Sequence, residues 1–457
     1  MMRKFTATAL FVLLTMAIFS TVYASNGTQI GNVGARSTAM ASCFRGLADD
    51  WSAVFFNPAG LTQLGTKWTI GASAGLIMPS GSYNAHPYPD NHLQFGGMYT
   101  DERNLVDKTF FVPAGGIFFK PSSKITVGLG VYAPFGLGTE WDLLTVPDGY
   151  MNTNAISKEN EHFSDHQVIT VQPTVAFKLS EKISLGIGLS YIWGKMILDQ
   201  VKLPAITTPM PMRIITETGL DGDGSTFGAN VGLLFAFSQK FQCGLSGRFA
   251  LSDLSLDGDV TFSLNPPTGN ITQTGTVEAD LPLPWTIGAG FAYKPSNRLT
   301  LTADVSMTNW ESWGDIVLKV DGITHPLTQE AITELTMEEN WENTIEAGFG
   351  LEFKAMDSES KQLFLRGGFY TVDTPAPDET MSPTILDPNR RYVFTGGLGL
   401  SLSKVSFNVA AEYIMFSEKD VQDYVFGPQE EGWLAENYAG LYNFSAFVFT
   451  FGTSIHL

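Results

Sequence analysis

Long apolar runs are almost missing from this chain. After the first two dozen residues no stretch of about 18 apolar residues occurs, which excludes a later transmembrane helix. Basic residues are scarce as well, with 27 Lys and Arg against 46 Asp and Glu. The resulting net charge of −19 argues against a nucleic-acid partner.

Residues for metal and redox chemistry are also few. The two cysteines, Cys43 and Cys243, are expected to stay unpaired as small hydrophobes, because Cys243 lies on the apolar face of its predicted strand. The six histidines do not have metal-ligand spacing, and no nucleotide-binding motif follows the N-terminal region. The sequence therefore predicts no metal, no cofactor and no energy-driven step.

The N-terminus has the pattern of an export signal. Arg3 and Lys4 precede an apolar run over residues 5–22, and residues 22–24 supply a cleavage site. We interpret residues 1–24 as a secretory signal peptide. A retained membrane anchor is the alternative.

The last residues, 440–457, alternate with a period of two. Every second position back from Leu457 is large and apolar except Thr453, and the positions between are mostly small or polar. This pattern predicts a strand with one apolar face, of the kind that closes an outer-membrane barrel.

Similar alternation recurs in about 14 segments, each long enough for a tilted membrane strand. The predicted fold is all-β, a 14-stranded antiparallel transmembrane β-barrel over residues 65–457 with both termini in the periplasm. The segments are 66–79, 109–121, 124–142, 166–180, 183–199, 225–238, 241–258, 276–294, 297–314, 341–354, 361–371, 390–403, 405–418 and 441–457.

The connections alternate between short turns and long loops, as in bacterial barrels. Two long loops, 200–224 and 315–340, contain apolar residues and suggest a landing groove for a hydrophobic ligand. Packing of the loops on each other is the alternative.

The alternation assigns each charged residue to a face of the wall. A charge in the middle of the lipid face costs roughly 2–4 kcal/mol. Charged residues are therefore expected on the lumen side, but Lys195 shares a face with Tyr191, which points to the lipid. Either the Lys195 side chain snorkels to the rim of the barrel, or a bulge shifts the register of its strand. The charges predicted to face the lumen are Arg248, Asp304, Glu346, Glu352, Arg366 and Glu412.

Residues 25–64 are too irregular for a strand pair and too apolar for a free tail. Asp49-Asp50 is typical of a turn or helix cap, and Asn57-Pro58 of a turn. We interpret residues 25–64 as a small hatch that plugs the barrel. A disordered periplasmic tail is the alternative.

A family resemblance starts in this segment. Residues 48–61, Ala-Asp-Asp-Trp-Ser-Ala-Val-Phe-Phe-Asn-Pro-Ala-Gly-Leu, resemble the hatch signature of the FadL/TodX outer-membrane transporters of hydrophobic compounds, whose best-known members take up long-chain fatty acids. Residues 132–141, 178–189, 222–228, 308–313 and 365–370 are similar to further family motifs. Family members end in an aromatic residue, whereas this chain ends in Leu457. This difference concerns how efficiently the barrel assembly machinery recognises the chain, and it does not concern the fold.

The resemblance implies a barrel with a gated hatch and a hole in its wall. Asp49, Asp50 and Asn57-Pro58-Ala59 would belong to the gate. Pro134-Phe135-Gly136 would form an inward kink of the third strand, which fits a proline that cannot donate and a glycine that tolerates bending. A simple bulge without a hole is the alternative.

A fatty-acid-like ligand needs an apolar slot and a cation near its carboxylate. The candidate ligand-binding residues are Phe55 and Phe56 of the hatch with Lys195, Arg248 and Arg366. Lys195 falls near a basic ligand-site residue of the family. For each arginine, a structural ion pair with a lumen carboxylate is the alternative.

Catalytic patterns occur in the wrong context. The Gly71–Gly75 motif matches a nucleophile elbow but lies within a strand, and Ser454 with His456 fits lumen packing. The Asp221–Asp223 motif lacks further calcium ligands and favours an exposed turn. We expect no enzyme; a lipid hydrolase and an adhesive barrel are weaker alternatives.

The sequence thus predicts an outer-membrane protein that lets fatty acids or hydrocarbons pass the lipopolysaccharide layer and leave sideways into the bilayer. The expected partners are these hydrophobic molecules, outer-membrane lipid with lipopolysaccharide, and the barrel assembly machinery. The main alternative is a non-selective porin with an open, charge-lined pore.

Overall fold

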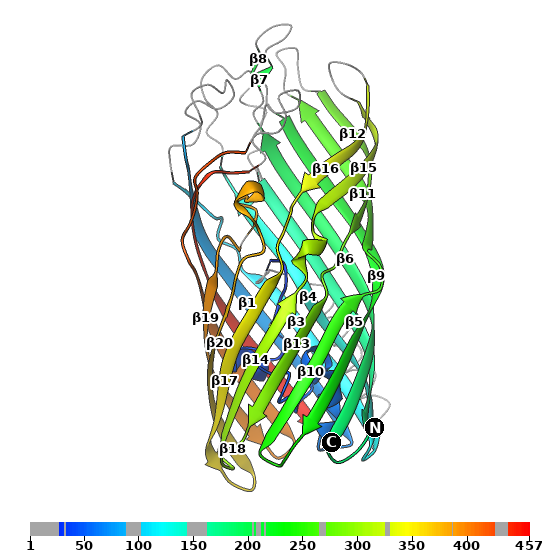
Figure 1. The fold of residues 1–457 in the computed structure, drawn as a ribbon, viewed down its shortest axis with the longest axis vertical. Coiled ribbons are helices and arrows are strands. Elements are labelled where there is room, and N and C mark those ends of the chain that lie inside the picture. The colour runs from blue at the N-terminus through cyan, green and yellow to red at the C-terminus, as the bar shows by residue number, and fades with distance from the viewer. Residues whose placement is uncertain are drawn as a thin grey trace.

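The wall of the molecule is one closed sheet of 14 antiparallel membrane strands, which Figure 1 shows as a tall cylinder. The first strand, β1 (Trp68–Ala85), pairs with the last, β22 (Gly440–His456), and closes the barrel. The predicted all-β, 14-stranded barrel is confirmed. This structure is a computed structural model and describes residues 27–31, 33–87, 102–143, 162–202, 205–206, 212–213, 216–264, 271–324, 330–385, 387–425 and 437–457.

The wall strands follow each other in chain order, as expected for hairpins joined by turns. Between β1 and β22 they are β3 (Phe110–Ser122), β4 (Ile125–Trp141), β5 (His162–Lys178), β6 (Ile183–Lys202), β9 (Thr216–Ala236), β10 (Phe241–Ala250), β13 (Thr286–Tyr293), β14 (Leu299–Thr308), β17 (Thr344–Asp357), β18 (Lys361–Val372), β19 (Arg391–Leu402) and β20 (Val405–Phe416). Shorter strands are β2 (Arg103–Asn104), β7 (Ala205–Ile206), β8 (Met212–Arg213) and β21 (Lys419–Val421).

Beyond the membrane wall, the sheet continues in β11 (Leu254–Leu264), β12 (Ile271–Leu281), β15 (Asp315–Thr324) and β16 (Ala331–Glu338). Each is separated from its wall strand by a short break, and the break at 282–285 contains two prolines, which cannot donate to a ladder. The predicted continuous strands 241–258 and 276–294 are therefore interrupted. In the connection between the predicted strands 241–258 and 276–294, and in the predicted loop 315–340, the described residues are largely strand.

The described residues of the two predicted loops are largely strand, so this part of the chain does not show the predicted landing groove. In the former loop 315–340, Ile323 is buried and Met337 packs against the core, while Leu335 is exposed. The predicted loop 200–224 is shortened because β6 runs to Lys202 and β9 starts at Thr216. Its residues 203, 210 and 214 lie outside the described residues.

The predicted exposed turn at Asp221 and Asp223 is also wrong, because both residues lie in β9 and pair across to β11. Charged side chains replace the apolar ones on the outer face of these extensions. Their apolar residues still alternate but face inward, as the buried Leu254, Leu256 and Val260 of β11 do, so these extensions lack the outward apolar face of a membrane strand.

Inside the lower half of the cylinder lies a compact segment, drawn in blue in Figure 1. We call residues 27–31 and 33–64 the inner segment. It contains the short helices α2 (Ala35–Ala39) and α3 (Ala53–Phe56) and the 3-10 helix η1 (Pro58–Gln63); two further 3-10 turns, η3 (Trp310–Ser312) and η4 (Asp378–Thr380), lie in connections between strands. In the described part of the chain, no helix is long and apolar enough to cross a membrane. The predicted signal peptide, residues 1–24, lies outside the described residues.

Candidate functional site

Glycines on the inner face of the wall let the inner segment lie directly against the strands. At Gly71 of β1 an added Cβ would overlap the Trp51 ring, and at Gly244 of β10 it would overlap the carbonyl oxygen of Arg45. Only a residue without a side chain permits so close an approach. The inner segment is therefore fitted to walls on different sides of the lumen.

Asn57 joins the inner segment to β9. Its side chain is completely buried, and its Nδ2 donates to the carbonyl oxygens of Arg45 and Leu233, both at 3.0 Å. Its Oδ1 accepts from the backbone N–H of Ala59 at 3.2 Å and so caps η1, with Pro58 as the first residue of that turn. The predicted Asn-Pro-Ala motif thus forms a buried joint.

A network of charges fixes α2 to the wall. Arg36 pairs with Glu352 of β17 through two hydrogen bonds, at 2.8 and 2.9 Å, and with Asp49 at 2.6 Å. Asp50 accepts from the same guanidinium at 3.5 Å. Burial opposes the charge of Arg36, but the three carboxylates outweigh it and hold its pKa well above the ordinary value. Asp49 and Asp50 therefore serve this ion-pair network.

Two of the three predicted ligand cations are not available to a ligand in the lumen. Arg366 donates to Glu352 at 2.6 Å and to Asn408 at 2.8 Å, so its charge is already used in a structural ion pair. Lys195 pairs with Asp221 at 2.9 Å on the outer face. The pairing of β6 with β9 is regular along its whole length, so no bulge turns Lys195 inward. These contacts favour structural ion pairs over the predicted ligand-binding roles of Lys195 and Arg366.

Arg248, the third predicted cation, faces the lumen from β10. Its guanidinium carbon lies 4.1 Å from the centroid of the Phe55 ring, a cation–π contact. The side chain is partly exposed, and within the described residues it forms no ion pair. Arg248 therefore offers an accessible, uncompensated positive charge.

The aromatic residues of α3 form the floor beside this charge. Phe55 meets the Tyr132 ring edge-on at 5.1 Å and the Phe56 ring at 4.9 Å. Phe56 turns to Phe44, at 5.8 Å. Phe55 thus borders the site with Arg248 and Tyr132, whereas Phe56 supports it from below.

Polar side chains that the sequence reasoning missed hold Phe55 in place. Gln172 of β5 and Asn230 of β9 each donate to the carbonyl oxygen of Val54 at 2.9 Å, and Asn230 also donates to that of Phe55 at 3.1 Å. These carbonyls end a helix and have no partner within it. Tyr132 donates its hydroxyl hydrogen to Gln172. The available signal was that these polar residues share the inward face of neighbouring strands.

The wall has a gap next to Tyr132. The ladder between β3 and β4 ends at the pair Gly115↔Val131. Above it, β3 still pairs with β1 as far as Phe110, and β4 still pairs with β5 as far as Trp141. Residues 110–114 and 132–136 therefore lie beyond the end of the β3–β4 ladder without pairing with each other.

The predicted kink lies at this gap. The pairing of β4 with β5 shifts register between Tyr132 and Phe135, as a bulge does. Above the gap, Leu105 bridges to Trp141, and its N–H donates to the Gly81 carbonyl at 2.9 Å. The gap is thus bounded at its upper and lower ends by paired backbone.

The start of the inner segment covers the gap from inside. We call residues 27–31 the strap. Gln29 forms an antiparallel bridge with Phe135; Ile30 N–H donates to Pro134 O at 2.8 Å, and Gly136 N–H donates to Thr28 O at 2.7 Å. Since Phe135 already pairs with β5 on its other side, the strap takes the edge that β3 leaves empty.

The strap is also tied to the opposite side of the lumen. Gln29 accepts from the Thr308 hydroxyl at 3.0 Å. The N–H of Gly27 donates to Asp387 at 2.9 Å, in the connection between β18 and β19. That connection reaches β4, because the Trp141 indole donates to Pro383 O at 2.7 Å. The described residues 373–385 and 387–390 therefore link the strap to the extracellular end of the barrel.

Comparison with known proteins agrees with this architecture. The family model described as "Outer membrane protein transport protein (OMPP1/FadL/TodX)" matches residues 16–456. An outer-membrane protein of Neisseria meningitidis serogroup B is 25% identical over 400 residues, which cover 83% of this chain and 82% of that protein.

Solved structures share the fold at low sequence identity. A Pseudomonas aeruginosa FadL homologue has a TM-score of 0.75 at 16% identity and covers 94% of this chain and 99% of that one. The Pseudomonas putida toluene transporter TodX has a TM-score of 0.66 at 14% identity, covering 95% and 100%. With the family model matching almost the whole sequence, the chain belongs to the OMPP1/FadL/TodX family of outer-membrane transport proteins.

Proposed function

We propose that this protein passively takes up hydrophobic molecules that carry a carboxylate, with long-chain fatty acids as the typical substrate. The observation that carries the proposal is Arg248, an inward cation without an ion-pair partner in the described residues, seated on the Phe55 ring. A carboxylate at this place would gain charge-assisted hydrogen bonds, while the ring and its aromatic neighbours would contact the alkyl chain.

A pure hydrocarbon fits this site less well. One structural neighbour is named a monoaromatic hydrocarbon channel, so such substrates occur among proteins of this fold. A hydrocarbon beside Arg248 would displace water from the guanidinium without replacing its hydrogen bonds, which is costly. The unpaired charge therefore favours an acidic ligand.

The exit that we propose is the gap between β3 and β4. Tyr132 is the first β4 residue beyond the last β3–β4 pair, and its ring contacts Phe55. The ligand site and the gap therefore adjoin. A molecule that leaves Arg248 through this gap would enter the hydrocarbon of the bilayer without crossing the polar periplasmic side.

The gate that we propose is the strap. It holds β4 by two backbone hydrogen bonds and the opposite wall by the bonds of Gln29 to Thr308 and of Gly27 to Asp387. The rest of the inner segment is fixed by the amide bonds of Asn57 and the ion pairs of Arg36. The sequence suggested movement near Asn57-Pro58-Ala59. These contacts favour that motif as a fixed anchor and residues 27–31 as the part that moves.

The test compares a long-chain fatty acid with the alcohol of equal chain length, by binding to the purified protein. Arg248→Gln should weaken fatty-acid binding roughly tenfold to a hundredfold, because a hydrogen bond to a charged group contributes about 1.5–3 kcal/mol. Binding of the alcohol should barely change. Lys195→Gln, on the outer face, is the matched control. Equal losses for both ligands, or none, would refute a carboxylate site at Arg248.

A further inference from the structure

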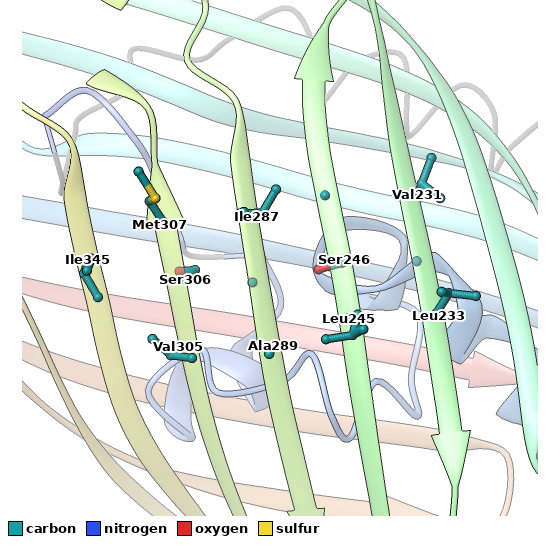
Figure 2. A pocket seen from close by; sticks show the side chains of 13 residues that line it. Val231, Leu233, Leu245, Ser246, Ile287, Ala289, Val305, Ser306, Met307 and Ile345 are labelled. Carbon is teal, nitrogen blue, oxygen red and sulfur yellow. The ribbon is translucent and has the colours of Figure 1, made fainter. Parts of the chain in front are cut away.

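The outer wall carries an apolar hollow that has no part in the proposed transport path. It lies across β9, β10, β13, β14 and β17 and has a volume of about 550 Å³ (Figure 2). Its rim consists of outward-facing side chains: Leu233, Leu245, Ile287, Val305, Met307 and Ile345.

The hollow arises because small residues interrupt two cross-strand rows. In the upper row Gly247 stands between Val231 and Ile287. In the lower row Ala289 stands between Leu245 and Val305. A Cβ added at Gly247 would meet the nearest side-chain atom, of Ile287, at an ordinary 3.5 Å, so the space outside this glycine is open.

The depth of the hollow fits one leaflet of the membrane. Gly247 lies six residues beyond Phe241, at the periplasmic end of β10. At about 3.3 Å per residue and a tilt of about 40°, this corresponds to a depth of about 15 Å, half of the ~30 Å hydrocarbon core. Exposed aromatic rings flank the hollow, with Phe291 below it and Phe249 above.

Two adjacent turns beneath the hollow, those next to β10 and β13, are basic, whereas the end of β17 and the turn after it carry Asp357 and Glu359. The turn before β10 contains Lys240, and the turn between β13 and β14 contains Lys294 and Arg298; neither turn contains an acidic residue. The two turns are neighbours, because Lys294 N–H donates to Lys240 O at 2.7 Å. Lys294 is 3.7 Å from Asp49. Lys240 and Arg298 are exposed and have no carboxylate within ion-pair distance in the described residues, although the charge of Arg298 also acts on Asp357 at the end of β17.

The opposite end of the same strands has the opposite charge. Beyond the breaks, Asp257 and Asp259 lie on the same face of β11. Asp257 pairs with Asp223 of β9, and Asp259 pairs with Asp221. An anionic head group is therefore repelled at the extracellular end and attracted at the periplasmic end.

We propose that this wall binds an anionic phospholipid of the periplasmic leaflet. Its phosphate lies against Lys240 and Arg298, and one acyl chain lies in the hollow over Gly247 and Ala289. Such a lipid would hold the barrel at a fixed depth on the side that contains the broken strands. The proposal is independent of the ligand in the lumen.

The experiment measures retained lipid by native mass spectrometry of the full-length protein in mild detergent, with phosphatidylglycerol or phosphatidylcholine added at equal concentration. The unmodified protein should retain phosphatidylglycerol preferentially. Replacing both cations, with Lys240→Gln and Arg298→Gln, should remove a preference of about thirtyfold, since each basic residue near an anionic lipid contributes about 1 kcal/mol. Gly247→Leu, which fills the hollow, should reduce retention of both lipids about tenfold.

The matched controls are Lys404→Gln and Ala411→Leu. Lys404 is an exposed lysine in the turn before β20, and Ala411 is an exposed alanine on the lipid face of β20. Both should retain lipid as the unmodified protein does. Equal retention in Gly247→Leu and the unmodified protein, or equal losses in the controls, would overturn the proposal and show unspecific annular lipid only. Fatty-acid binding at Arg248 should stay unchanged in every variant, so the outcome is separable from that of the transport proposal.

Discussion

Glu339 is a single residue from which we expect an effect of pH on the protein. It lies between β16 and β17 beside Trp341, and its backbone oxygen accepts from the Thr380 hydroxyl at 2.7 Å. Burial raises the pKa of its carboxyl from 4.5 to about 7, although the nearby Trp341 side chain works against this. The neutral form is therefore the one that the folded state favours.

The sign of the pH effect follows from linkage. A carboxyl with a raised folded pKa stabilises its surroundings fully below the unfolded pKa of 4.5, and this contribution is lost as the pH rises through about 7. We expect tryptophan fluorescence to change between pH 5 and 8 with a midpoint near 7. In Glu339→Gln this transition should be missing. A transition that persists in the variant would assign the effect to another group.

Asn57 gives a second prediction for a single side chain. Asn57→Ala leaves the buried carbonyls of Arg45 and Leu233 without their donor, at a cost of about 1–3 kcal/mol for each. The urea midpoint of unfolding should fall, while the barrel still assembles because the wall ladders are unchanged. Gln239→Ala, in an exposed turn, is the control. A midpoint equal to that of the control would argue against the anchor.

At the scale of elements, the pairing of the strap with β4 decides whether the gap is open. The hydrogen bonds on either side of Gln29 and Phe135 make these residues a directly opposed antiparallel pair without mutual hydrogen bonds. In such pairs the Cα atoms are about 4.5 Å apart, within the range that a disulfide spans. The strap can therefore be locked covalently.

We expect the Gln29→Cys, Phe135→Cys pair to stop uptake when oxidised and to restore it on reduction. The same variant should also carry Cys43→Ala and Cys243→Ala, so that only the two new cysteines can form a disulfide. Uptake of labelled fatty acid into cells or proteoliposomes is the measurement. Uptake that is the same in both redox states would show that the strap need not leave β4.

At the scale of the whole molecule, the inner segment separates a transporter from a porin. Wall glycines and buried polar bonds fit residues 33–64 tightly to the strands, which leaves little room for a continuous water path. We expect no steady ion conductance in planar bilayers. Deletion of residues 27–64 should produce a conducting pore, because the β1–β22 ladder closes the barrel without them. Steady conductance of the unmodified protein would favour the porin.

The sequence predicts the strands of the barrel wall better than it predicts the residues of the ligand site. Barrel strands show in the sequence because lipid contacts every second residue, and this environment is the same for all strands. The extensions β11, β12, β15 and β16 were predicted only in part, because they leave the lipid and their apolar residues, such as Leu256 and Leu318, face inward instead of outward. Of the predicted ligand cations, Arg248 and Arg366 have the same inward parity, and only the neighbouring Glu352 distinguishes them.

The amino-acid sequence by itself determined the closed barrel, the inward faces of its charges and the presence of a separate segment at its start, because periodicity and composition are local properties of the chain. The tertiary structure alone decided that the strap pairs with β4, that β3 and β4 part above Val131 and that Arg248 keeps its charge free beside Phe55. Each of these depends on groups that are distant in sequence. Packing inside the lumen brings these groups together, and a local sequence pattern does not predict such packing.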